Sequence, residues 1–423
     1  MLTRADSEYL CRVGPGTPMG ELFRRFWLPA TLTWELPEPD GAPVRLRLLG
    51  EDLVLWRDFT GAIGAIRDAC PHRGASMFFG RNEESGLRCV YHGWKFDTSG
   101  TCVDMPNEPA ESNFKHKIRA TAYPCAEYAD IVWIYMGPQS PAPGLPQLDW
   151  GDVPSSHRYS SKWDQACNWA QGLEGNVDSS HVGFLHKWFD PTASPEAANA
   201  GASRFEDRSP VLTVKETEFG YVYGARRTTA TGYYWRLTPF ILPCYTMVPG
   251  PASPGYPRRV DYTVPMDDEH TWWFRTIYRE GRPLEPELVE NYKAGAFHFP
   301  RMIPGTWHPV PNAANDYQID REMQRKVNFT GIFNGREQDM AIVETMGKMF
   351  DRTIEHLGAA DTAIIAFRRL IMRLARQLEQ GVEPWAPNHP EVFRVRSVDF
   401  QDGEGDLGAV MDSHRQAMIA PLA

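Results

Sequence analysis

The first part of the chain alternates hydrophobic and polar residues with a period of two. Over residues 44–48, valine and leucine alternate with arginine, and a Gly-Glu-Asp turn at 50–52 leads into a second apolar run. Successive side chains of a strand point to opposite faces, so this alternation is typical of strands with one buried face. Short strand-like runs with glycine-rich turns continue to residues 131–136. The pattern therefore predicts a small all-β domain.

The pattern changes after residue 137. Four prolines lie within residues 138–146. Proline lacks a backbone N–H donor and cannot sit inside a helix or a central strand, so this stretch is predicted to be part of a linker. Beyond it, helical and strand-like patterns mix, and a helical stretch from Ala363 carries its apolar residues on one stripe. Strand-like runs lie at 211–215, 221–227, 233–240 and 271–278.

These patterns divide the chain into four segments. Residues 1–42, with a short amphipathic helix at 18–28, are expected to pack on the second domain. Residues 43–137 form the all-β domain, residues 138–155 the linker and residues 156–423 the second domain. A chain of 423 residues is too long for one ordinary core, which agrees with two domains.

Composition and charge narrow the class of protein. With 42% hydrophobic and 23% charged residues, the chain has the composition of a globular protein. A net charge of −10 argues against nucleic acid as a partner. No run of 18 apolar residues occurs, so no membrane span is expected. Seven irregularly spaced cysteines, and an N-terminus without a signal-peptide pattern, favour a reducing cytoplasm over a disulfide framework.

Two cysteine–histidine pairs lie in the predicted β domain. One residue separates Cys70 from His72, and after sixteen further residues Cys89 and His92 follow with two residues between them. Two thiolates and two imidazoles suit a Rieske [2Fe–2S] cluster, in which cysteines hold one iron and histidines the other. A structural zinc site is the alternative, since zinc accepts the same ligands. Zinc fingers more often space their pairs as Cys-x₂₋₄-Cys and His-x₃₋₅-His, so the spacing favours the cluster.

A second candidate metal site begins with Asp178, His181 and His186. Two histidines and a carboxylate on one face of an iron leave positions open for O₂. Histidines five residues apart lie about 140° apart on an ideal helix. Both can bind one metal only if the helix ends or distorts between them, and Gly183 is a plausible place.

With both motifs present, the chain resembles the α-subunits of the Rieske non-haem iron oxygenases. The pattern Asp-x₂-His-x₄-His is that family's iron-binding segment, and its third ligand is an aspartate in a helix far downstream. The run 331–344 matches that place, so the resemblance implies Asp339 as the ligand, with Glu337 and Glu344 as rivals. The stretches 315–321 and 351–358 resemble the phthalate dioxygenase-like branch.

The resemblance implies a fold, cofactors and partners. The fold is α+β, an all-β Rieske domain followed by a catalytic domain whose large antiparallel sheet is flanked by helices (helix-grip-like). The cofactors are a [2Fe–2S] cluster and a mononuclear Fe(II), and the partner is an NAD(P)H-dependent flavin and iron–sulfur reductase. The assembly is a homotrimer or stacked trimers. Asp178 would bridge His92 of one subunit and the iron-bound histidine of its neighbour.

The same resemblance implies O₂ and a small aromatic acid, of the phthalate or benzoate type, as substrates. The outcome is cis-dihydroxylation, or monooxygenation with O-demethylation. Arg226 and Arg236, on strand-like runs, are candidates to bind the substrate carboxylate, because guanidinium can bind it through two hydrogen bonds. Alternation puts Arg226 and Arg227 on opposite faces, and each arginine could instead be a solvated surface charge. An electron-transfer Rieske protein without an active mononuclear site is the alternative function.

Overall fold

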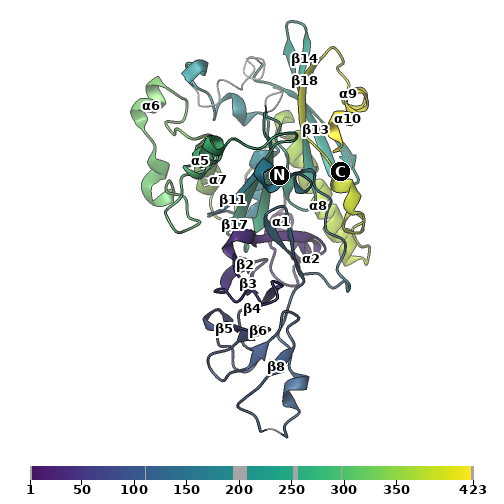
Figure 1. Cartoon of the computed structure of the whole chain (residues 1–423). Coiled ribbons are helices and arrows are strands. Elements are labelled where there is room, and N and C mark those ends of the chain that lie inside the picture. Colours follow the sequence, from purple (N-terminus) through teal and green to yellow (C-terminus); the bar gives the residue numbers. More distant parts are fainter. Residues whose placement is uncertain (1, 110, 194–206, 251–255, 297, 421–423) are drawn as a thin grey trace. The chain divides into compact units, whose positions relative to one another are not determined.

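The structure is a computed structural model that describes all residues except 1, 110, 194–206, 251–255, 297 and 421–423 (Figure 1). The chain forms two compact units. Val13–Leu145 make up one unit, here called the cluster unit, and Met1–Arg12 with Pro146–Ala423 make up the other, here called the sheet unit. In the described part of the chain, none of the helices combines the length and apolar character that crossing a bilayer requires.

The cluster unit is built from three small antiparallel sheets. The alternating segments near residue 44 form the first of them, as the pattern predicts, and Gly64 lets its third strand pack closely on Trp56, whose ring would lie 2.5 Å from an added Cβ. The sheets run β2(Val44–Leu48)-β3(Glu51–Arg57)-β4(Ile63–Arg67), β5(Arg81–Glu83)-β6(Gly86–Arg88)-β7(Lys95–Phe96)-β8(Cys102–Asp104) and β1(Trp27–Leu32)-β10(Ile131–Tyr135)-β9(Cys125–Tyr128).

The N-terminal segment is divided between the two units, unlike the expectation that all of residues 1–42 pack on the second domain. Helix α1 (Arg4–Cys11) belongs to the sheet unit and packs on α3 (Trp169–Asn176) and α8 (Thr362–Glu379). Helix α2 (Pro18–Arg24) and strand β1 belong to the cluster unit. The reason is that β1 is apolar on both faces and pairs with β10, with its proline at an irregularity in the register.

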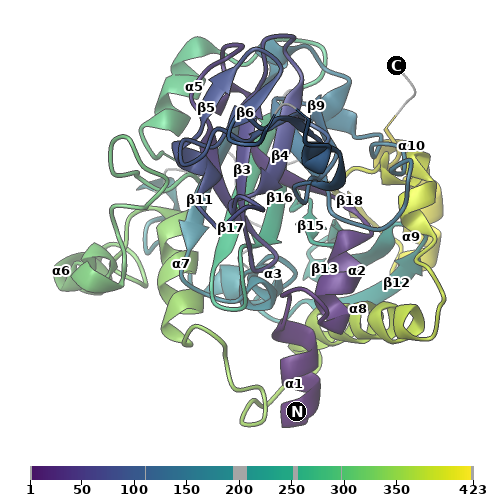
Figure 2. The same ribbon diagram turned by 90° about the horizontal axis from the view of Figure 1, so that it is seen from below.

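The sheet unit has an eight-stranded antiparallel sheet. Its order is β11(Arg158–Gln165)-β17(Thr271–Tyr278)-β16(Arg258–Pro265)-β15(Tyr245–Thr246)-β14(Gly232–Ile241)-β13(Gly220–Thr229)-β12(Val211–Thr217), and β18(Val398–Asp402) pairs with β14. Figure 2 shows α8 beside β12 at one end of the sheet and α7 (Gly335–Thr345) beside β11 at the other. The described residues also form the helices α5 (Pro286–Lys293), α6 (Arg321–Lys326), α9 (Leu407–Ser413) and α10 (Arg415–Met418). The predicted fold, an all-β domain followed by a large antiparallel sheet with helices, is confirmed.

Candidate metal centres

The two cysteine–histidine loops of the cluster unit have the same backbone design. In each loop the cysteine N–H donates to the carbonyl five residues later, and the glycine four residues after the cysteine donates back to the cysteine carbonyl, all at 2.8–3.0 Å. Gly74 and Gly93 take φ angles of 77° and 80°, which a glycine adopts without strain. The repeated geometry explains why two short motifs fold into matching loops.

The side chains of these loops form a donor set for a Rieske cluster. His72 Nδ1 and His92 Nδ1 lie 3.1 Å apart, and the ring of His72 stacks on Trp94. Cys70 and Cys89 are free thiols in one hydrophobic core cluster. Burial, together with the neighbouring Cys89, raises the pKa of Cys70 to about 11, so the Cys70 thiol would lose its proton only to a bound metal. Two thiols and two facing imidazole nitrogens therefore fit the cluster.

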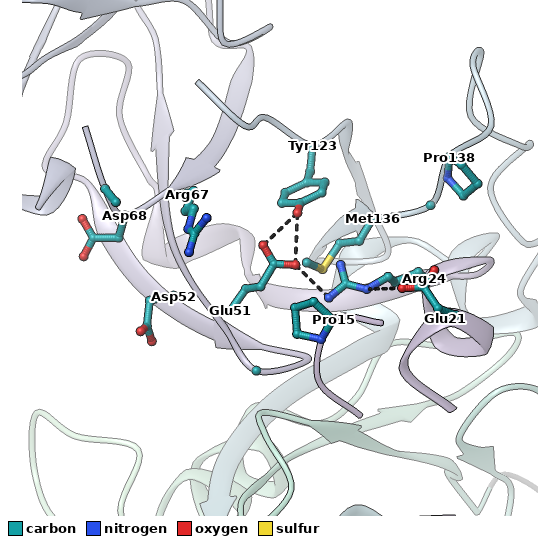
Figure 3. Close-up of a pocket in the computed structure, with 13 residues that line it drawn as sticks. Pro15, Glu21, Arg24, Glu51, Asp52, Arg67, Asp68, Tyr123, Met136 and Pro138 are labelled. Carbon is teal, nitrogen blue, oxygen red and sulfur yellow. Dashed lines mark hydrogen bonds and ion pairs between the residues drawn. The ribbon is translucent and has the colours of Figure 1, made fainter. Parts of the chain in front are cut away.

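A surface hollow of about 680 Å³ lies in the cluster unit (Figure 3). Arg24 forms an ion pair with Glu51 at 2.7 Å, and Tyr123 donates to the same carboxylate at 2.9 Å. Burial and the nearby Glu51 raise the pKa of Tyr123 to about 12. Four carboxylates and two guanidinium groups line the hollow, so an anionic aromatic substrate would be repelled there.

The second site lies in the sheet unit, where the helix that leads to it ends early. Helix α3 stops at Asn176, and a 3₁₀ turn spans His181–Gly183. The two histidines therefore do not share one α-helix, and the angle expected between them on an ideal helix does not apply. A nitrogen of His181, a nitrogen of His186 and a carboxylate oxygen of Asp339 lie within 4.8 Å of one another.

Asp339 comes from α7, whose N-terminus is capped by Asn334. Its Oδ1 lies 3.1 Å from His186 Nε2 and 3.7 Å from His181 Nε2, while its Oδ2 lies 3.6 Å from Arg336 Nη1. Burial raises the pKa of Asp339, but His186, Arg336 and His181 outweigh it and hold that pKa well below its usual range. The charged carboxylate is therefore available to bind a cation.

The rival carboxylates are bound elsewhere. Glu337 accepts hydrogen bonds from Arg301 Nε and Nη2, each at 3.0 Å. Glu344 accepts a hydrogen bond of 2.6 Å from the hydroxyl of Tyr317. The structure thus brings Asp339, and neither rival, to the two histidines.

The outer nitrogen of each histidine also has a partner. His181 Nδ1 lies 3.4 Å from Asp178 Oδ2, and Asp178 accepts a second hydrogen bond from the Ser180 N–H. His186 Nδ1 lies 2.7 Å from Oε1 of Gln338, the residue just before Asp339. Sequence reasoning missed Gln338, whose only sequence signal is this adjacency.

The predicted substrate arginines lie on opposite faces of the sheet. Arg226 donates to the Gly405 carbonyl and lies over the Tyr233 ring. Arg236 pairs with Ala225 in the register, which puts it on the same face as Arg227 and opposite to Arg226. Arg227, rather than Arg226, therefore shares a face with Arg236.

Arg227 links this face to the iron-binding segment. Its Nη2 donates to the Ser179 carbonyl at 2.8 Å, one residue after Asp178. Among the described residues, Arg227 Nη1 and Arg236 Nε are buried without a hydrogen-bond partner. Burial and the nearby Arg236 lower the pKa of Arg227 to about 10, so it keeps its charge at neutral pH. Two buried cations with free donors are suited to an anionic ligand.

An all-β unit with paired Cys/His loops, and a sheet domain with two histidines and an aspartate around one point, together define a class of Rieske-type iron oxygenases. Residues 26–124 match the model of the Rieske [2Fe-2S] domain, and residues 134–402 match the model described as LigXa C-terminal domain like. The chain belongs to the Rieske non-haem iron oxygenases. Membership confirms the predicted [2Fe–2S] cluster and mononuclear iron as the family's cofactors.

Several relatives match along most of their length. The chain is 39% identical to the phthalate 4,5-dioxygenase oxygenase subunit of Pseudomonas putida, over 90% of this chain and 88% of that one. It is 38% identical to the 3-chlorobenzoate-3,4-dioxygenase oxygenase subunit of Comamonas testosteroni, over 94% of each. It is 32% identical to the 5,5'-dehydrodivanillate O-demethylase oxygenase subunit of a Sphingobium strain, over 91% and 83%.

Solved structures share the fold at lower identity. The terminal oxygenase of carbazole 1,9a-dioxygenase from Nocardioides aromaticivorans matches with a TM-score of 0.57 and 20% identity, over 85% of this chain and 97% of that one. A complex of an oxygenase with the ferredoxin of carbazole 1,9a-dioxygenase matches with a TM-score of 0.58 and 19% identity, over 90% and 99%. These structures show the fold, and the relatives at 32–39% identity confirm the predicted function as an oxygenase component of a multicomponent system.

Proposed function

We propose that this oxygenase component uses O₂ and electrons from a reductase to oxidise a small aromatic carboxylic acid. One observation carries the proposal: donor atoms of His181, His186 and Asp339 lie within 4.8 Å of one another beside a sheet face with two buried arginines. The named relatives that act on phthalate and 3-chlorobenzoate support an acid of that type.

We assign the ligands residue by residue. Cys70 and Cys89 would hold one iron of the cluster and His72 and His92 the other. The mononuclear iron would be held by two histidines and one carboxylate, at positions 181, 186 and 339. When bound, the cluster supplies electron transfer and the mononuclear iron supplies O₂ activation. A carboxylate oxygen and an imidazole lone pair 3.1 Å apart repel each other unless a cation or proton lies between them, which supports a metal here.

We propose that Asp178 joins the two centres of neighbouring subunits in a trimer or a stacked pair of trimers. Its contact with His181 Nδ1 supports this role, since an exposed part of the carboxylate remains for a neighbour's His92. Each centre also lies beside exposed apolar side chains that a second copy of the chain would cover. These are Val90 and Tyr91 near the cluster, and Phe184, Phe189 and Phe329 near the iron site.

We propose that Arg227 and Arg236 bind the substrate carboxylate. Their free donors, Nη1 and Nε, could each donate to a carboxylate oxygen. Desolvated cations bind an anion more strongly than solvated ones, so the carboxylate would orient the ring above the iron ligands. Arg226, on the other face, would keep its structural contact with Gly405.

The electron donor would be an NAD(P)H-dependent reductase carrying flavin and an iron–sulfur centre, which acts either directly or through a ferredoxin. The matched oxygenase–ferredoxin complex supports a docked protein donor. A cytoplasmic location follows from this proposal, because NAD(P)H is supplied there.

The test is turnover of the complete system. The protein would be loaded with Fe(II), mixed with a reductase and NADH, and offered a panel of benzoates and phthalates with the methyl ester of each as control. We expect acid-dependent consumption of NADH and O₂ in step with a hydroxylated product, identified by mass spectrometry as a diol or a demethylated phenol. Equal oxidation of esters and acids would refute carboxylate recognition, and oxidation of neither would refute the aromatic acid as substrate.

A further inference from the structure

The two candidate iron-binding histidines have chemically different partners on their outer nitrogens. His181 Nδ1 faces the carboxylate of Asp178, whereas His186 Nδ1 faces the amide of Gln338. We propose that Gln338 is a positioning residue that fixes which ring nitrogen of His186 is presented to the metal. The inference rests on the proposed function, in which His186 is an iron ligand.

The direction of the Gln338 amide is fixed by its other contact. Gln338 Nε2 donates to the Ile332 carbonyl at 2.7 Å, and a carbonyl can only accept. The same carbonyl accepts a hydrogen bond of 2.9 Å from Asn328 Nδ2, which holds it in place. Gln338 is 1% exposed, so no solvent competes for the amide. The atom that faces His186 is therefore Oε1.

An amide oxygen is an acceptor only, so the facing nitrogen of His186 must carry a proton. With Nδ1 protonated, the lone pair of neutral His186 lies on Nε2, the atom 3.1 Å from Asp339 Oδ1. Metal-bound histidines in general donate their second N–H to a carboxylate or carbonyl, which fixes the ring and the tautomer. Gln338 thus presents His186 to the metal already in its binding tautomer.

The difference between the two partners is electrostatic. Asp178 presents a carboxylate, which accepts a hydrogen bond from the Ser180 N–H and is negatively charged when ionised. Gln338 is neutral and cannot take a proton. The arrangement gives one histidine an anionic partner and the other a neutral one, which keeps a third negative charge away from a site that already has Asp178 and Asp339.

The test uses Co(II) alone, titrated into protein whose mononuclear site has been emptied while the oxidised cluster is retained. Gln338→Leu removes the acceptor, and we expect Co(II) to bind about 10–100-fold more weakly. Gln338→Glu keeps an acceptor for the Nδ1 proton, and we expect it to restore most of the lost affinity. The cluster absorbance reports the integrity of the cluster unit in every variant.

A matched control is Gln171→Leu. Gln171 is a buried amide that donates to the Val343 and Gly347 carbonyls at 3.1 and 2.8 Å and touches neither histidine. We expect this variant to lower the melting temperature while leaving Co(II) affinity unchanged, which separates positioning from general destabilisation.

A second readout is the NMR spectrum of the Co(II)-loaded protein. The Nδ1 proton of His186 should give a shifted, exchangeable signal in the wild type and in Gln338→Glu, and the signal should be lost in Gln338→Leu. Wild-type affinity in Gln338→Leu, or no recovery in Gln338→Glu, would overturn the role of Gln338. If instead the wild type bound no Co(II), the proposed iron site itself would fail.

Discussion

The two candidate metal centres are built in opposite ways. The cluster donors all come from residues 70–92, on two loops with the same hydrogen-bond pattern and the same positive-φ glycine. The mononuclear donors come from residues 181–186 and from residue 339 on a separate helix. A site made of neighbouring loops can be predicted from the spacing of its residues along the chain. A site made of distant segments depends on how those segments pack together.

The supporting residues differ in the same way. Trp94, which stacks on His72, lies in the second cluster loop itself. The partners of the mononuclear donors, Gln338 and Arg336, are held by contacts to Ile332 and Gln165. The mononuclear centre should therefore be more sensitive to changes in the fold of the sheet unit than the cluster.

Removing one proposed ligand at each centre should have the largest effect. Cys89→Ser should abolish the cluster absorbance, because the thiolate is replaced by a weaker ligand. His186→Ala should abolish substrate oxidation while the cluster absorbance stays at the wild-type level. Visible spectroscopy and product analysis of both variants check this, and a His186→Ala enzyme that still turned over would contradict the assigned ligand set.

The next effect concerns the buried ion pairs beneath the iron-binding segment. Glu174 on α3 lies 2.8 Å from Arg368 Nε and 3.1 Å from Arg352 Nη2. Glu174→Gln leaves Arg352 without its carboxylate partner and leaves Arg368 with Glu355 alone, so it should lower the free energy of unfolding of the sheet unit by about 3–5 kcal/mol. Urea unfolding followed by far-UV circular dichroism measures it. The control is Glu216→Gln, whose exposed pair with Arg373 should contribute less than about 1 kcal/mol.

The same buried ion pairs set the direction in which the stability of the sheet unit changes with pH. Burial raises the pKa of Glu174, but Arg352 and Arg368 outweigh it and lower that pKa below its usual range. A carboxyl with a lowered pKa in the folded state stabilises the fold above its unfolded pKa, and this contribution is lost as the pH falls. Acid should therefore destabilise the wild type more than Glu174→Gln. Equal acid sensitivity of the two proteins would argue against the pair.

Asp178→Asn should interrupt the proposed connection between the two centres while leaving both metals bound. Both metals should stay bound, because Asp178 is not a proposed ligand, while substrate oxidation should fall by at least about 10–100-fold. Metal analysis and single-turnover product formation check this prediction. Normal turnover in this variant would rule out the bridging role.

The smallest effect concerns the substrate arginines. Arg236→Gln should raise the KM for the aromatic acid by about 10–100-fold with a smaller change in kcat, because a charged hydrogen bond made in both ground and transition states is lost. Arg226→Gln, on the opposite face of the sheet, should leave KM unchanged. Steady-state kinetics of the two variants decide the matter, and an equal rise in both would mean that the face assignment does not determine binding.

The sequence pattern predicted the two-domain fold, and the motifs with the family resemblance named the residues that we propose for both centres, but the pattern failed where packing decides. The alternation near residue 44 and the apolar stripe from Ala363 each reflect one buried face, so they could be recognised locally. Strand β1 could not be recognised in this way. Its residues are apolar on both faces, so they show no alternation, and its partner β10 lies about a hundred residues away along the chain.

Two features of the mononuclear site also could not be predicted from the pattern of hydrophobic and polar residues. Alternation placed Arg226 and Arg227 on opposite faces but could not say which face is the inner one. Gln338 gave no signal beyond its place next to Asp339, because a glutamine in a helix is ordinarily a solvated residue, and the role we propose for it follows from its hydrogen bond to the Ile332 carbonyl. Helix α3 ends at Asn176, before the two histidines, since glycine, asparagine and serine after Leu173 favour turns over helix.

One chain should hold iron at two centres, one built from neighbouring loops and one built from distant segments. The most direct measurement is the ratio of iron to acid-labile sulfide after loading with Fe(II), in the wild type and in Asp339→Ala. We expect about three irons for two sulfides in the wild type and about two for two in the variant, with the same cluster absorbance. An identical ratio in the two proteins would contradict it.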